Sequence, residues 1–410
     1  MNVELVTRRK DLAALTQRWD ELAQTDLRDG FFRTSTWFLS WIEHVRQDAK
    51  PFVVVVRDNA GEIVGLAPLC RLTNWDLGFP LTGISSAGRE VVSGDFLDFV
   101  SERAERATIT SAILGFLWDV RSKWSMLTLG ELLDGSESHR ALENLGDKTG
   151  LAVRLQEERT CPHIVLPGSF EEYLSSLSNS SRYHIRRRFR DIVEKKGGRI
   201  EVFSKPQDIA NHLDLLIRLH LARWRSKNLP GTMGQSGFAP FLKQVCGKPP
   251  AGSECRLYLL TYGGSPAAAL LTFYFGQSAL YYQAGWDPNS PIAHLSPGVV
   301  LMAQSIRDAI EHGLRYYEFL RGDEAYKSRW TKTYRKTITI LLARSLLAKQ
   351  YVRIARMKDS VKRLIGSRPN GKQDSGATIE TTMKDQEESG ERKSPRTGYD
   401  NPHLTCNRVA

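Results

Sequence analysis

The sequence has little cysteine and no long apolar run. Five cysteines are spread over 410 residues, and no two of them form a Cys-x-x-Cys pair. This odd set of isolated thiols argues against a disulfide framework and against a zinc site. No stretch approaches the roughly 20 apolar residues that a membrane-spanning helix needs, and the first residues contain no apolar signal-peptide core. We therefore expect a cytoplasmic protein that binds no metal.

The overall composition is that of a globular protein with a positive net charge. Hydrophobic residues make up 41% of the chain and charged residues 25%, which is enough to build a sizeable core. The formal net charge is +11, so we expect an anionic partner or ligand. The positive charges gather in three segments, residues 182–199, 327–336 and 349–363.

Alternating helical and extended patterns predict an α/β fold made of two similar halves. Residues 52–72 and 256–275 each read as a strand, a tight turn rich in Gly, Asn, Asp or Pro, and a returning strand. We place a first domain at residues 1–155 and a second at 156–345. A basic amphipathic helix is expected at 346–365, and the composition of residues 366–410 predicts a disordered tail.

The segment from Ala284 to Trp330 contains the most informative pattern. We expect a strand at 280–284, a helix that opens at Ser296-Pro297-Gly298, and a second strand at 316–320. Proline near a helix start costs no hydrogen bond, because the first amides of a helix are unpaired. Those amides and the helix dipole favour an anion, although an ordinary helix start capped by Ser296 fits the local pattern as well.

This order of motifs, together with the arginine-rich helix expected at 181–193, resembles the acyl-CoA N-acyltransferases of the GNAT superfamily, of the CelD type. That family is associated with bacterial cellulose or exopolysaccharide synthesis. The likeness covers residues 150–345 well and the first half only in layout. It implies tandem GNAT-like domains with mixed sheets flanked by helices, the first domain being degenerate. More distantly, the chain is similar to the FemABX aminoacyltransferases, which use aminoacyl-tRNA.

The resemblance also implies a site. Acyl-CoA, with acetyl-CoA as the first candidate, would be a co-substrate and no cofactor would be bound permanently. Its pantetheine arm would lie between the strands at 280–284 and 316–320. Its phosphates would rest at Ser296, Gly298, Val299 and Val300. The sequence lacks the Gln/Arg-x-x-Gly-x-Gly/Ala phosphate motif of common GNAT enzymes.

Several side chains that follow the two strands suit acyl transfer to an amine; Asp287 follows the first strand, and the others follow the second. Tyr326 is the predicted proton donor to the leaving thiolate, because a phenol in this place is frequent in the family that the chain resembles. A carboxylate would hold or deprotonate the amine, and a cation would bind an acidic acceptor or a phosphate. A packed tyrosine ring, solvated loop carboxylates and a solvated helix face are the plain alternatives. The candidate carboxylates are Asp287, Asp323 and Glu324, and the candidate cations are Arg321, Lys327 and Arg329.

Three functions stay open at this point. The first is an N-acyltransferase that acts on a small-molecule or glycan amine in polysaccharide or cell-envelope biosynthesis. The second is a FemABX-like transferase that uses aminoacyl-tRNA, and the third is a non-catalytic scaffold in a polysaccharide-export assembly. Helix 346–365 has the pattern of a membrane-surface helix. Sequence-specific nucleic-acid binding is disfavoured, because the arginine run at 182–199 lacks interleaved aromatic residues.

Overall fold

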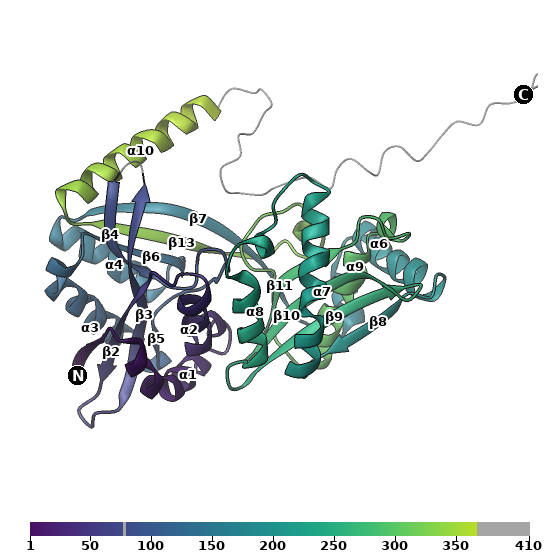
Figure 1. Ribbon diagram of the computed structural model, residues 1–410, viewed down its shortest axis with the longest axis horizontal. Helices are drawn as coiled ribbons and strands as arrows, with labels where there is room; N and C mark the ends of the chain where they lie inside the picture. The colour runs from purple at the N-terminus through teal and green to yellow at the C-terminus, as the bar shows by residue number, and fades with distance from the viewer. Residues whose placement is uncertain (77–78, 367–410) are drawn as a thin grey trace, which may run out of the picture.

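The computed structural model describes residues 1–76 and 79–366 (Figure 1), so nearly all of the predicted tail lies outside the described residues. A large mixed sheet runs through the described part of the chain. Its strand order is β1-β2-β3-β4-β6-β13-β7-β12-β11-β10-β9-β8, and β5 pairs with β3. Helices cover both faces, so the predicted α/β class with mixed sheets flanked by helices is confirmed.

The first half is an antiparallel meander that ends in a parallel pair. Its first strands pair antiparallel from β1 to β4, and β4 then pairs parallel with β6 over Gly83–Ser85 and Met126–Thr128. Its strands are β1 (Asn2–Val6), β2 (Lys50–Arg57), β3 (Ile63–Asp76), β4 (Phe79–Ser86), β5 (Val100–Ser101) and β6 (Met126–Leu133); its helices are α1 (Thr16–Gln24), α2 (Ser35–His44), α3 (Arg106–Asp119) and α4 (Glu137–Thr149).

The second half repeats this layout. Its strands are antiparallel from β8 to β11, and β11 pairs parallel with β12. Both predicted hairpins are confirmed, as β2–β3 and β9–β10. The strands are β8 (Arg199–Phe203), β9 (Ser253–Tyr262), β10 (Ser265–Phe275), β11 (Ser278–Trp286) and β12 (Tyr316–Glu318); the helices are α5 (Phe170–Ser176), α6 (Asn179–Phe189), α7 (Pro206–Arg225), α8 (Phe238–Gly247) and α9 (Pro297–Glu311).

Two strands tie the halves together. The first is the long strand β7 (Ala152–Val165), which pairs with β13 along most of its length and with β12 at its end. Strand β13 (Tyr334–Ala343) lies between β6 and β7, so a late segment of the chain completes the sheet of the first half.

Residues 326–334 do not form one regular element. They contain a single 3-10 turn at Lys327–Arg329, and Tyr334 already belongs to β13. The β-branched run from Thr337 to Ile340 pairs on both sides, and this pairing extends the strand back to Tyr334.

The halves share an aromatic core. Phe31 of the first half stacks on Phe273 of β10, with ring centroids 4.4 Å apart, and Trp37 of α2 packs edge-on against Phe241 of α8. Helices α7 and α8 cover this face of the second half's sheet, while α9 covers the opposite face. The two halves are therefore packed together through large buried rings.

Helix α10 (Leu346–Gly366) forms where the basic helix was predicted, and it lies across the first half (Figure 1). Its buried residues Tyr351 and Val352 pack on Leu81 and Leu341 of the sheet. Leu347 stays exposed to solvent. Within residues 1–76 and 79–366, no helix has the length and apolar character needed to cross a bilayer.

Candidate functional site

The two central parallel strands of the second half separate soon after they meet. Strands β11 and β12 pair over three positions, from Ser278 opposite Tyr316 to Leu280 opposite Glu318. Strand β12 then ends, whereas β11 continues to Trp286. The pairing thus ends where the family resemblance implies an opening between the strands at 280–284 and 316–320.

Two tyrosines meet at this opening. Tyr281 is the first residue of β11 beyond the pairing, and the Tyr326 hydroxyl donates to the Tyr281 hydroxyl over 3.5 Å. Loss of hydration raises the pKa of both phenols, and the nearby Arg223 guanidinium opposes this rise. Both hydroxyls therefore stay protonated at neutral pH, as a proton donor must.

Of the three predicted carboxylates, only Glu324 shifts the pKa values of these two tyrosines. Its charge raises the pKa of Tyr326, and its carboxylate forms an ion pair with the Lys327 ammonium at 2.8 Å. The Asp287 carboxylate instead accepts from the Asn289 amide over 2.9 Å, as turn residues do. Asp323 is exposed in the loop.

The predicted substrate cations are engaged within the protein. Lys327 is 3% exposed, and its ammonium donates to the carbonyls of Arg321 at 2.8 Å and Gly322 at 3.3 Å. Arg321 forms ion pairs with Asp95 at 2.7 Å and Glu131 at 2.6 Å. Both cations thus hold the loop that carries Tyr326, and neither faces an acceptor in this conformation. Arg329 contacts His184 at 3.1 Å.

The partners of Arg321 come from the first half. The loop of residues 87–99 is here called the clamp loop. Its Asp95 carboxylate accepts a hydrogen bond of 2.8 Å from the Arg321 amide. The Val92 carbonyl of the same loop accepts a hydrogen bond of 2.8 Å from the Tyr282 hydroxyl. One loop of the first half therefore holds both β11 and the segment after β12, the two sides of the opening.

The clamp loop is held in an unfavourable backbone conformation. Val91, Ser93 and Phe96 have φ of 64°, 54° and 55°, and Leu320 beside Arg321 has 58°. Such angles cost of order 1–3 kcal/mol each for residues other than glycine, and they gather at functional sites. Burial and Glu131 raise the pKa of Asp95 to about 6, although Arg321 opposes this.

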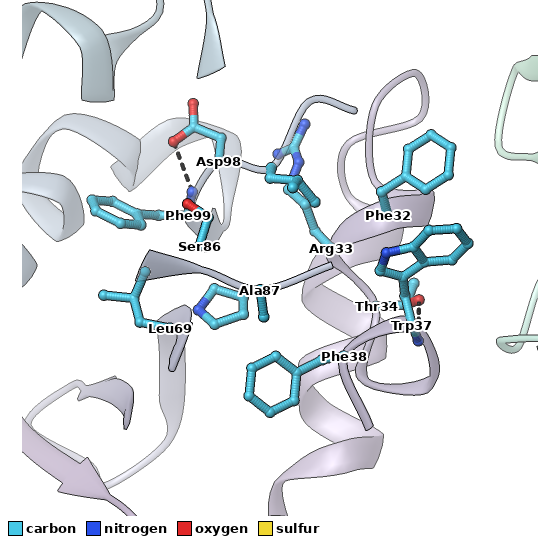
Figure 2. A pocket seen from close by; sticks show the side chains of 12 residues that line it. Phe32, Arg33, Thr34, Trp37, Phe38, Leu69, Ser86, Ala87, Asp98 and Phe99 are labelled. Atoms are coloured by element: carbon cyan, nitrogen blue, oxygen red, sulfur yellow. Dashed lines mark hydrogen bonds between the residues drawn. The ribbon is translucent and has the colours of Figure 1, made fainter. Parts of the chain in front are cut away.

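A small pocket borders the clamp loop in the first half (Figure 2). Arg33 and Asp98 face it among aromatic rings such as Trp37. Its polar groups bond to the protein itself. The Arg33 guanidinium donates to the Phe96 carbonyl over 2.8 Å and pairs with Asp26 at 2.9 Å. These contacts assign the pocket to the packing that holds the clamp loop.

Helix α9 begins at Pro297, where the sequence predicted a helix start. Ser296 adopts a left-handed conformation with φ of 56°, and its side chain makes no capping bond, so the Ser-cap alternative is wrong. The Val299 amide donates to the Ser296 carbonyl over 2.9 Å. A side chain at Gly298 would meet only Trp286, at 3.8 Å. The space above Gly298 is therefore open, as the approach of a phosphate requires.

Among the described residues, no cluster of three or more His, Cys, Asp or Glu side chains could hold a metal ion.

Comparison with known proteins gives one family match, which lies in the second half. Residues 179–328 match the family model described as an acetyltransferase (GNAT) domain. This range includes α9, the opening between β11 and β12, and Tyr326. No curated protein matches the sequence.

Among solved structures, the crystal structure of FemX has a TM-score of 0.58 at 12% identity, covering 89% of this chain and 100% of its own. The C-terminal domain (DUF2156) of a putative lysylphosphatidylglycerol synthetase from Agrobacterium fabrum has a TM-score of 0.49 at 11% identity, covering 84% and 96%. A tandem GNAT protein from the clavulanic acid biosynthesis pathway has 0.47 at 11% identity, covering 84% and 99%. The first likeness shows that the chain shares the fold of FemX.

Proposed function

The chain carries an acetyltransferase (GNAT) domain over residues 179–328, and on that premise we propose that it is an N-acyltransferase that moves an acyl group from acyl-CoA to an amine. The observation that carries this proposal is the opening between β11 and β12, with a protonated phenol, a carboxylate and a helix N-terminus around it. Acetyl-CoA is the first candidate for the donor.

The proposed reaction is a direct transfer. The amine nitrogen attacks the thioester carbonyl carbon, the carbon–sulfur bond breaks, and coenzyme A leaves as a thiolate. Tyr326 gives that thiolate its proton, while Glu324 accepts the proton that the attacking amine loses. Both residues lie on the loop that Arg321 and Lys327 hold in place, so the protein's main contribution is to fix their positions.

The coenzyme's phosphates are proposed to lie at the start of α9. The candidate residues are Ser296, Gly298, Val299 and Val300, where the dipole of a 15-residue helix favours negative charge, although the Ser296 and Val299 amides already donate to the carbonyls of Ala293 and Ser296. Asp323 is the second candidate for the base, because it neighbours Glu324 in the same loop. The resemblance to CelD-type proteins supports an acceptor in polysaccharide or cell-envelope biosynthesis.

Calorimetry with acetyl-CoA tests the donor. Gly298→Glu places a carboxylate in the open space above the helix start, so we expect it to weaken binding at least tenfold by repulsion and steric exclusion. Gly115→Glu adds the same charge at another unobstructed helical glycine, in the first half, and should bind like the wild type.

Three results would contradict the proposal or its phosphate site. Equal affinity of a folded Gly298→Glu protein would exclude the helix start as the phosphate site. A wild-type protein that binds tRNA but no acetyl-CoA would favour the aminoacyl-tRNA alternative, and one that binds neither would favour the scaffold. The arginines of α6 are already partly neutralised, since Arg186 pairs with Glu171 at 2.6 Å.

A further inference from the structure

Two cations lie one helical turn apart at the end of α7, against tryptophan rings. The Arg223 guanidinium lies 4.1 Å from the ring centroid of Trp286 and 5.2 Å from that of Trp224. The Lys227 ammonium lies 5.9 Å from the Trp224 ring. Stacking on aromatic faces holds both charges in place and removes part of their hydration.

Three arginines that are buried or half-buried elsewhere in the described residues show the usual way of neutralising such a charge. Arg33, Arg321 and Arg335 each pair with a carboxylate at 2.9 Å or less. In the described part of the chain, neither Arg223 nor Lys227 forms an ion pair with a carboxylate.

Buried donors accompany the two charges. The Arg223 Nε and Trp224 Nε1 atoms are both shielded from solvent, and neither has a hydrogen-bond partner among the described residues. An unpaired buried donor costs about 1–3 kcal/mol. Burial and the charge of Arg223 also lower the pKa of Lys227. Two like charges and two unused donors are an unfavourable arrangement that a bound anion would relieve.

This cationic group lies at the opening between β11 and β12. The charge of Arg223 lowers the pKa of Tyr281 and of Tyr326 against the effect of burial, so the guanidinium lies near both phenols. On its other side is Trp286, which in turn borders Gly298 at the start of α9. The cations therefore lie between the proposed acid and the proposed phosphate site, on a separate helix.

We propose that Arg223 and Lys227 bind an anionic group, a carboxylate or a phosphate, on the amine acceptor itself. This inference rests on the proposed function. The acceptor is then an amine that also carries a negative charge, of the class of amino acids or phosphorylated amino sugars. Its ammonium group faces Glu324, and its anion lies on Arg223. The phosphates of coenzyme A are the other source of the same chemistry, and the experiment separates the two.

The test uses matched amines with acetyl-CoA as donor. Glucosamine 6-phosphate is compared with glucosamine, and glycine with glycinamide. The wild type should prefer an anionic member by about 10–100-fold in kcat/KM, the size of a charge-assisted hydrogen bond. Arg223→Gln and Lys227→Gln should lose that preference, measured as the ratio of kcat/KM between the two members of each pair, while their KM for acetyl-CoA stays unchanged. Arg225→Gln removes an exposed charge at the same helix end and should behave like the wild type.

Three results would overturn the inference: no anion preference in the wild type, a preference that survives in both variants, or a loss that appears as a raised KM for acetyl-CoA. The last result would assign the cations to the coenzyme. Arg223→Lys keeps the charge and should retain part of the preference, which separates a binding role from a packing role.

Inorganic phosphate gives a second measurement that needs no turnover. It should raise the melting temperature of the wild type and of Arg225→Gln more than that of Arg223→Gln, and an equal rise in both would overturn the inference. A wild type that transfers acetyl to no amine would refute the proposed function alone, since the phosphate measurement still decides whether the anion site exists.

Discussion

The buried contact between Asp95 and Arg321 should cost the protein stability and be retained for geometry. Asp95 is 0% exposed, and burial raises its pKa from the ordinary 3.8 to about 6 in spite of Arg321 at 2.7 Å. This difference corresponds to about 3 kcal/mol of unfavourable free energy for the ionised form. The folded state then binds more protons than the unfolded state between these two pKa values. Ionisation of Asp95 therefore lowers the free energy of unfolding as the pH rises from about 4 to about 7.

Asp95→Asn tests this reasoning, because asparagine resembles the neutral acid and cannot ionise. Urea unfolding of both proteins at pH 4 and pH 7 cancels the other titrating groups. From pH 4 to pH 7, we expect the free energy of unfolding of the variant to rise by up to about 3 kcal/mol relative to that of the wild type. Single-turnover acyl transfer should nevertheless slow in the variant, since the clamp loop then loses its ion pair to Arg321 and keeps only hydrogen bonds such as that from the Gly94 carbonyl. A stability difference that moves the other way would refute the reasoning and show that Arg321 more than offsets the burial of Asp95.

Three further predictions concern single side chains. Tyr326→Phe should slow single-turnover acyl transfer by roughly 10²–10⁴-fold with unchanged acetyl-CoA affinity, and a wild-type rate would exclude the phenol as the acid. Phe273→Ala removes a ring that stacks on Phe31 across the halves, so urea unfolding should show a loss of about 3–5 kcal/mol; a loss below 1 kcal/mol would mean that the halves do not depend on this contact. Ser136→Ala removes the hydrogen bond that the His139 amide donates at the start of α4, so the free energy of unfolding should fall by about 1 kcal/mol. Ser175→Ala, at an exposed position of α5 that caps no helix start, is the comparison and should cost less.

Local chemistry made the main elements of the fold predictable. The turn residues at 58–61 and 263–266 fix the hairpins, and Pro297 marks the start of α9. Strand β4 and helix α3 were not predicted. The place of β13 was not predictable from its neighbours, because its partners β6 and β7 are set by long-range pairing.

The residues of the candidate site also divide into those that local sequence could group and those that long-range contacts bring together. Glu324 and Tyr326 could be grouped because they share one loop of the chain. Asp95 lies 226 residues from Arg321 in sequence, and no local pattern marks it as the partner of that cation. Arg223 lies at the end of helix α7. The signal in the sequence was three cations at the helix end, Arg223, Arg225 and Lys227, with no acidic residue one turn away.

The position of β13 has a consequence for synthesis on the ribosome. Strands β6 and β7 leave the ribosome with an empty place between them, and the strand that fills it is complete only at Ala343. About 200 residues separate the end of β6 from that point, which at 5–20 residues per second is roughly 10–40 s of translation. During this interval the first half has two unpaired strand edges, which are sites where other chains can add. The first half is thus translated first and completed last, and any truncation within the second half leaves both halves unfinished.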